Sequence, residues 1–197
     1  QDFDYNYNTS SSVAAADLSF SISNAAKLDN IDLSVEGSVV NKYESLSGEA
    51  TSPLTTGYSA RLNFGTHGFI LKGEYMDRKS DPGFYNANDT TRNRAIQVEL
   101  GYSGYGFGAL ATFRQLKNAS FQGYRGKTEM FTLINYVPAL TQQHTYMLAT
   151  MNPYSPQADE IGGQVDLFYN FKKGSVIGGK KGMKVHANFS TFYGKYL

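Results

Sequence analysis

Three polar side chains at alternate positions, His186, Asn188 and Ser190, are the best candidates in this sequence for nucleophilic catalysis. A serine hydrolase requires a base within hydrogen-bond reach of its nucleophile. Residues four apart along a strand are separated by about 13 Å, which is too far for His186 to activate Ser190. We therefore expect no enzyme activity from this set, and we interpret His186 as part of a polar network.

The segment Gly174–Lys181 is close to a phosphate-binding P-loop. That motif requires Ser or Thr after its lysine and a helix after the loop. Lys181 occupies the Ser/Thr position, and the residues that follow alternate like a strand. We interpret the segment as a flexible basic turn and expect no nucleotide binding.

Metal-ligand spacing is also missing from the sequence. The three histidines are scattered along the chain, and the acidic loop that contains Asp77, Asp81, Asn86, Asn88 and Asp89 lacks the spacing of an EF-hand. We therefore assign no catalytic, cofactor-binding or metal-binding residue and predict no cofactor.

Charged residues inside strand-like segments form a more informative set. In Ile161–Lys172 apolar and aromatic residues alternate with polar ones, and side chains with a period of two point to opposite faces of a strand. Similar segments along the chain put charges of both signs on the polar side, where they suit a water-filled lumen and not lipid. Acidic residues such as Glu74 and Glu99 are expected to pair across strands with Arg61, Lys72 and Arg114. The predicted lumen-facing polar network comprises Glu36, Arg61, Lys72, Glu74, Glu99, Arg114, Asp166 and His186.

The elements that position these residues are about ten or eleven strands with almost no helix. Tight turns are expected at Thr66-His67-Gly68 and Ser103-Gly104, and they alternate with longer polar loops. Short periplasmic turns that alternate with long extracellular loops are typical of outer-membrane barrels. Segments 129–137 and 143–151 alternate poorly. The predicted strands are 1–7, 17–23, 31–42, 58–66, 68–77, 94–103, 105–115, 129–137, 143–151, 161–172 and 183–193.

A soluble β-sandwich also alternates apolar and polar residues, and it is the main alternative fold. Sandwich strands usually have about five or six residues, whereas tilted membrane strands have about nine to eleven. Tyr58, Tyr75, Tyr102, Tyr105 and Tyr193 fall at strand ends, where the aromatic girdles of a membrane barrel lie. The pattern favours an all-β, antiparallel, up-and-down transmembrane β-barrel, with residues 1–197 forming one domain or part of one.

Composition agrees with this interpretation and excludes several classes of protein. The 197 residues include 15 Tyr and 13 Phe but no Cys, so disulfides and thiolate metal sites are excluded. A net charge of +1 gives no support for nucleic-acid binding. The longest stretch without acidic or basic residues, Met130–Ala158, is broken by prolines, which argues against a membrane-spanning helix. No signal peptide precedes Gln1, so we expect a mature or truncated form of an exported protein.

One run of sequence resembles a known family. The residues Asn135–Tyr146, NYVPALTQQHTY, are followed by Asn152-Pro153-Tyr154 and by Glu160–Lys172. Together they resemble an uncharacterised family of outer-membrane β-barrel proteins from Bacteroidota, catalogued as a domain of unknown function, best over residues 94–193. Members of that family are typically longer, so the resemblance implies that this chain is an incomplete portion of a larger barrel. It supplies no catalytic residues.

We therefore expect an integral β-barrel protein of the bacterial outer membrane that acts as a passive pore, a solute channel or a scaffold. The alternative is an accessory or structural subunit of a Bacteroidota outer-membrane secretion or barrel-assembly complex. The expected partners are outer-membrane lipid and other outer-membrane or periplasmic proteins, and not nucleic acid.

Overall fold

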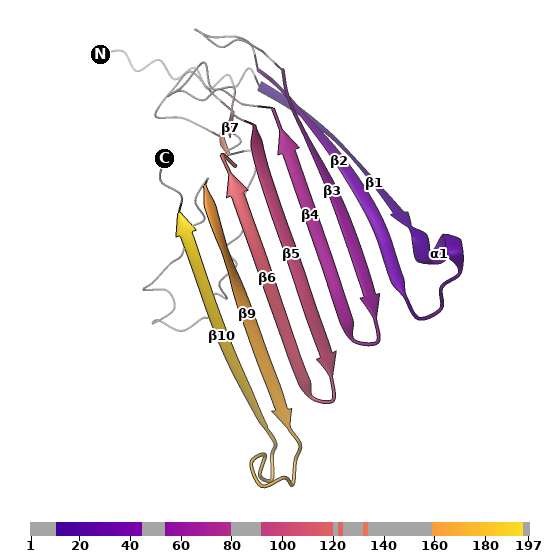
Figure 1. Ribbon diagram of the computed structural model, residues 1–197, viewed down its shortest axis with the longest axis vertical. Helices are drawn as coiled ribbons and strands as arrows, with labels where there is room; N and C mark the ends of the chain where they lie inside the picture. Colours follow the sequence, from indigo (N-terminus) through magenta and orange to yellow (C-terminus); the bar gives the residue numbers. More distant parts are fainter. Residues whose placement is uncertain are drawn as a thin grey trace.

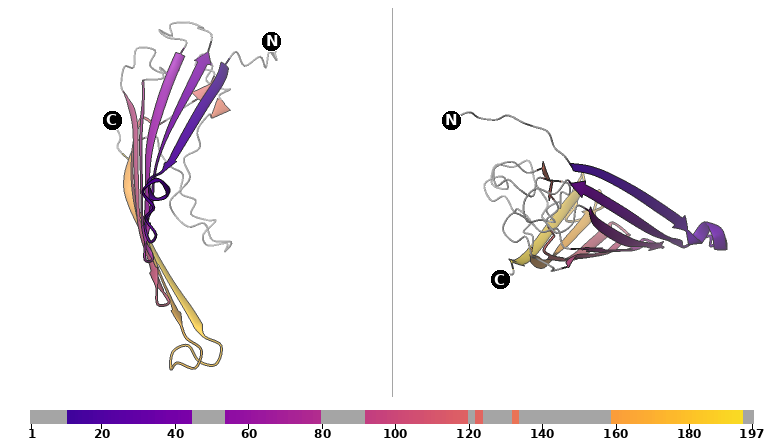
Figure 2. Two further views of the ribbon diagram at one scale, coloured as in Figure 1. Left: turned by 90° about the vertical axis from the view of Figure 1, so that its right-hand side faces the viewer. Right: turned by 90° about the horizontal axis from the view of Figure 1, so that it is seen from above.

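The computed structural model describes residues 11–44, 54–79, 92–119, 122–123, 132–133 and 159–194. Eight strands in these ranges form one curved sheet (Figures 1 and 2). They are β1 (Ser11–Ser21), β2 (Asp32–Glu44), β3 (Leu54–Thr66), β4 (Phe69–Arg78), β5 (Asn93–Gly104), β6 (Phe107–Lys117), β9 (Glu160–Phe171) and β10 (Met183–Gly194). The two-residue strands β7 (Gln122–Gly123) and β8 (Thr132–Leu133) pair separately, and the helix α1 (Ile22–Ala26) connects β1 to β2.

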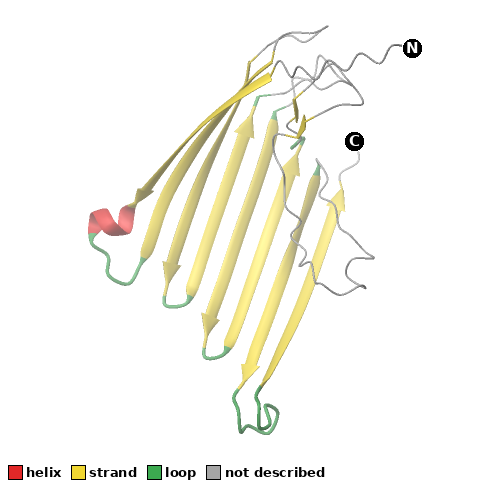
Figure 3. Cartoon of the chain, turned by 180° about the vertical axis from the view of Figure 1, so that it is seen from behind, coloured by secondary structure: helices red, strands yellow, loops and turns green. Residues whose placement is uncertain are grey.

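The sheet is an up-and-down meander in which each strand pairs antiparallel with its neighbours (Figure 3). Its order is β1-β2-β3-β4-β5-β6-β9-β10, and within the described residues β1 and β10 are edges that do not pair with each other. This confirms the all-β, antiparallel, up-and-down fold. The open sheet is consistent with an incomplete portion of a barrel.

Most predicted strands are present, but the first described strand differs from its prediction over 17–23. β1 begins at Ser11 and ends at Ser21, where the Ser21 side chain accepts a hydrogen bond from the Asn24 backbone N–H and caps α1. The cap satisfies a donor at the start of the helix, so the chain leaves the strand there. The predicted strands 1–7 and 143–151 lie outside the described residues, and of 129–137 only Thr132–Leu133 is described.

The two tight hairpins show why face alternation does not fix the position of a turn. The predicted turn at His67-Gly68 is confirmed, since both residues have positive φ (41° and 85°), as a two-residue type I′ turn requires. The prediction for Ser103-Gly104 is wrong, because these residues end β5 and the turn is Tyr105-Gly106 (φ 52° and 82°). A shift of two residues keeps every side chain on the same face, so the alternation fits either turn.

The distribution of buried residues in the sheet is the reverse of that in a soluble protein. Among the described residues the buried hydrophobic ones are Leu116 and Ala119, whereas the largest fully buried side chains include Arg114, Lys42 and Glu160. One face of the sheet, which we call the apolar face, leaves its large side chains exposed. It includes Leu18, Phe20, Val35, Tyr58, Leu62, Phe69, Tyr75, Val98, Leu100, Phe107, Phe113, Val165, Leu167, Tyr169, Val185 and Phe189.

Candidate functional site

The opposite face, which we call the polar face, gathers the charged residues of the strands. The register places Glu36, Arg61, Glu74 and Arg114 in one row across β2 to β6, with Gln97 between the last two. The neighbouring rows on the same face contain Lys72 opposite Glu99, then Asp166 opposite Asn188, and then His186 opposite Phe168. All eight residues of the predicted network therefore lie on one face of one sheet.

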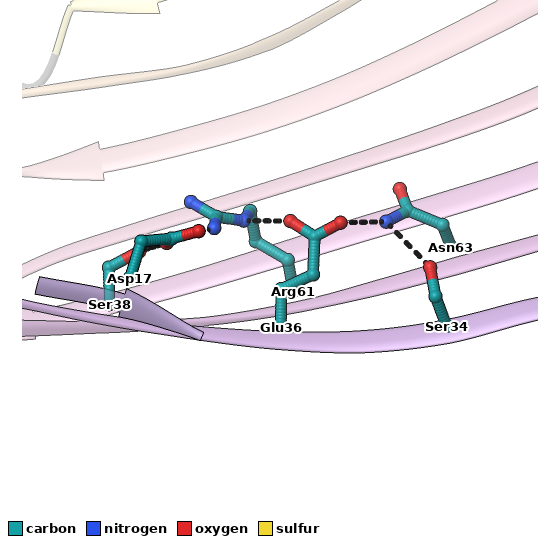
Figure 4. A network of polar contacts seen from close by, with 6 residues as sticks. All are labelled: Asp17, Ser34, Glu36, Ser38, Arg61 and Asn63. Atoms are coloured by element: carbon teal, nitrogen blue, oxygen red, sulfur yellow. Dashed lines mark hydrogen bonds and ion pairs between the residues drawn. The ribbon is translucent and has the colours of Figure 1, made fainter. Parts of the chain in front are cut away.

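Arg61 joins the first three strands through two carboxylates (Figure 4). Its Nε donates to Glu36 Oε2 over 2.7 Å, and its Nη2 donates to the Asp17 carboxylate from β1. The other oxygen of Glu36 accepts a hydrogen bond from Asn63 Nδ2 over 3.0 Å. Ser38 donates to Asp17. The network fixes the relative positions of the three strands with charge-assisted hydrogen bonds.

A second ion pair lies at the end of the sheet at which β6 ends and β9 begins. Arg114 Nη2 is 3.0 Å from Glu160 Oε1, joining β6 to β9, and the two side chains are only 2% and 1% exposed. Glu160 was not among the predicted network residues, because the sequence pattern placed it at the end of a loop. Because water screens this pair so little, removing either side chain would leave the other charge buried without this partner and would lower the stability of the fold.

A third cluster surrounds Asp166 on β9. Its carboxylate accepts hydrogen bonds from the side-chain amides of Gln164 and Asn188, and His186 Nε2 lies 3.5 Å from its Oδ1. These contacts hold His186 beside an acidic partner. Ser190 lies four residues beyond His186, about 13 Å along β10, so this serine does not reach the imidazole.

The ion pairs of the polar face differ from the predicted ones, in which Glu74 and Glu99 are the acidic partners. Arg61 lies between Glu36 and Glu74 in the register but pairs with Glu36. Lys72 stands opposite Glu99, yet among the described strands no ion pair joins them, and Glu99 accepts a hydrogen bond from Gln97 over 2.9 Å. On the described strands this face therefore carries charges of both signs, and its ion pairs join Arg61 to Glu36 and Asp17, and Arg114 to Glu160.

The segments considered for metal or nucleotide binding are used otherwise where the structure describes them. In the β9–β10 connection Gly179 N–H donates to Ser175 O (2.9 Å) and Gly174 N–H donates to Gly179 O (2.7 Å). The hydrogen bonds of these two amides therefore stay within the loop. Asp77 binds two arginines, and Asp81, Asn86, Asn88 and Asp89 lie outside the described residues. Across the described ranges no three metal-ligating side chains come together.

The described part of the chain contains no helix that is long and apolar enough to cross a membrane.

Comparison with known proteins gives one match. A family model, DUF6029, described as a family of unknown function, matches residues 3–196. The match extends well beyond residues 94–193, over which the sequence resemblance was strongest. No curated protein and no solved structure matches the chain.

Proposed function

We propose that this chain, which belongs to the DUF6029 family of unknown function, forms part of an outer-membrane β-barrel without a catalytic site that acts as a passive pore or a scaffold. The observation that carries the proposal is the reversed distribution of side chains. Among the residues that the structure describes, the largest fully buried side chains are polar, and an apolar face extends across the sheet. Soluble monomers rarely expose contiguous apolar patches of more than a few hundred Å².

Contact with lipid removes the free-energy cost of exposing that apolar face to water. Leu18 is 75% exposed, Phe189 69% and Leu100 56%, so the exposed side chains lie on β1, β5 and β10, far apart across the sheet. Apolar surface favours a nonaqueous environment by about 25 cal/mol per Å². Strands of 10 to 13 residues also have the length needed to cross a bilayer at a tilt.

Within a membrane the two open edges must be paired. Unsatisfied backbone N–H and C=O groups are too costly in hydrocarbon, so open sheet edges are not exposed to lipid. β1 and β10 are therefore the places where further strands join this sheet to complete the barrel.

The polar face then forms part of the wall of a water-filled lumen. It carries charges of both signs, and some of them pair locally, as Arg61 does with Glu36 and Arg114 with Glu160. These ion pairs link neighbouring strands of the lumen wall, and a wall of mixed charge has no ring of one sign that would select ions. A weakly selective passive pore is the function that this arrangement supports best.

Planar-bilayer recording of the purified protein tests the pore. We expect stepwise conductance with cation and anion permeabilities within about threefold of each other, because paired charges create little net field. Strong selectivity for one sign would contradict a wall of balanced charge.

The open edges also favour the second candidate, an accessory or structural subunit of a Bacteroidota outer-membrane secretion or barrel-assembly complex. β1 and β10 then pair with strands of another protein. A protein that gives no conductance but is isolated from native membranes in a stoichiometric complex with another barrel would support the subunit and reject the pore.

A further inference from the structure

Charged residues interrupt the apolar face at one level only among the described strands, near the end of the sheet at which β4 ends and β5 begins. Asp77 on β4 stands opposite Arg94 on β5, and Arg94 stands opposite Lys117 on β6. Arg92 immediately precedes β5. We call Asp77, Arg92, Arg94 and Lys117 the rim cluster. It contains three cations and one carboxylate.

The carboxylate organises the two arginines and leaves most of their donors available. Asp77 Oδ1 accepts from Arg92 Nε (2.9 Å) and Nη2 (2.6 Å), and Oδ2 accepts from Arg94 Nε (3.3 Å). Tyr75 also donates to Asp77, over 3.2 Å. Each guanidinium has five N–H donors, while Arg92 remains 60% exposed and Arg94 53%. The cluster is a pre-oriented, solvent-facing cationic site.

The residues next to the rim cluster are apolar or aromatic. On β5, Ile96 and Val98 follow Arg94 on the same face, with Tyr75 opposite Ile96. Tyr58 stands opposite Asp77 and is exposed. From the rim toward the middle of the sheet the face therefore changes from charged to apolar side chains, and the tyrosines Tyr58 and Tyr75 lie in the first two rows. An anionic phospholipid has the same order, from phosphate through the interfacial region to hydrocarbon.

We infer that the rim cluster binds the phosphate group of an anionic membrane lipid whose acyl chains lie along β4, β5 and β6. The inference rests on the proposed function, because it requires the apolar face to contact lipid. Arginine suits this role because its planar fork contacts phosphate oxygens with two parallel hydrogen bonds. Asp77 is a positioning residue, since it holds both arginines and does not contact the phosphate.

The opposite end of the sheet supplies a matched control. Lys180 and Lys181 lie in the β9–β10 connection, beyond the strands, and they are exposed. Changing both to glutamine removes the same charge as Arg92→Gln with Arg94→Gln. Of the two pairs, only the arginines are joined to Asp77, which lies on the apolar face.

The test measures lipid affinity by native mass spectrometry of the detergent-solubilised protein, titrated with phosphatidylglycerol or phosphatidylcholine. We expect the unchanged protein to bind phosphatidylglycerol at least tenfold more tightly than phosphatidylcholine. The R92Q/R94Q variant is expected to lose most of this preference, since each basic residue near an anionic surface contributes about 1 kcal/mol, or roughly fivefold. The K180Q/K181Q variant is expected to keep it.

Three results would overturn the inference. They are equal affinity of the unchanged protein for the two lipids, an equal loss of preference in the lysine control, or displacement of phosphatidylglycerol by low-millimolar inorganic phosphate, which would indicate a site for free phosphate.

If R92Q/R94Q does not fold, the salt dependence of lipid binding by the unchanged protein provides the test. Raising NaCl from about 0.05 to 0.5 M should reduce the preference for phosphatidylglycerol, because exposed charges are screened. A preference that is insensitive to salt would reject the site.

The same preparation separates the inference from the proposed function. Failure to insert into phosphatidylcholine vesicles, which carry no net charge, would contradict the membrane proposal itself. Insertion without a preference for phosphatidylglycerol would contradict only the lipid site.

Discussion

Leu100→Arg is expected to reduce the stability of the protein in a lipid bilayer by about 2–4 kcal/mol, the cost of a cation on the lipid face near the middle of a membrane barrel. Leu100 is 56% exposed on the apolar face, between Leu71 of β4 and Ala111 of β6. It has room for a larger side chain, so the loss is one of solvation and not of packing. Urea titrations in phosphatidylcholine vesicles, followed by circular dichroism, measure the change.

Gln97→Arg is the matched control, on the same strand but on the polar face. Gln97 stands between Glu74 and Arg114 in the register, where one neighbour attracts and the other repels a new cation. We expect a change within about 1 kcal/mol, as for a partly solvated ion pair. Equal losses for the two variants would show that the two faces meet the same environment, contrary to the proposed membrane location.

Glu160→Ala is expected to cost about 3–5 kcal/mol, because it leaves the buried Arg114 guanidinium without this carboxylate. The two side chains are 3.0 Å apart and almost fully buried, so little water is available to compensate the charge. The double variant R114M/E160L replaces both charges by apolar groups and should recover at least half of the loss. The same urea titration measures both.

A double variant as unstable as Glu160→Ala would show that the cost comes from lost packing and not from the uncompensated charge. A cost below about 1 kcal/mol for Glu160→Ala would show that the pair is hydrated in solution, since exposed ion pairs contribute no more than this.

The period-two pattern predicted β2 to β6, β9 and β10 because the two faces of a strand must satisfy different surroundings. It placed the start of β1 at residue 17 and not at Ser11, because the Ser, Val and Ala residues of Ser11–Ala16 give little contrast between the two faces. It also placed one hairpin two residues too early, at Ser103-Gly104 and not at Tyr105-Gly106. Alternation determines which way side chains point, but it does not determine where a strand begins or turns.

Partner choice on the polar face depends on information that the sequence pattern lacks. Arg61 has a carboxylate opposite it on each neighbouring strand, Glu36 and Glu74. It pairs with Glu36, and Asp17 binds the same guanidinium. The prediction for 17–23 put Asp17 at the first position of its strand, whereas it lies well inside β1. The residue types of the face were therefore predictable, and its bonds were not.

The measurement that tests the proposed membrane location most directly is lipid contact along a single strand. The chain has no cysteine, so single cysteines can be placed at Ile96, Gln97, Val98, Glu99 and Leu100 of β5 and labelled with a fluorophore. In vesicles of brominated phosphatidylcholine, we expect strong quenching at positions 96, 98 and 100 and weak quenching at 97 and 99, because only alternate side chains meet lipid. Uniform quenching along the strand, or none at any position, would contradict a sheet whose apolar face lies in a membrane.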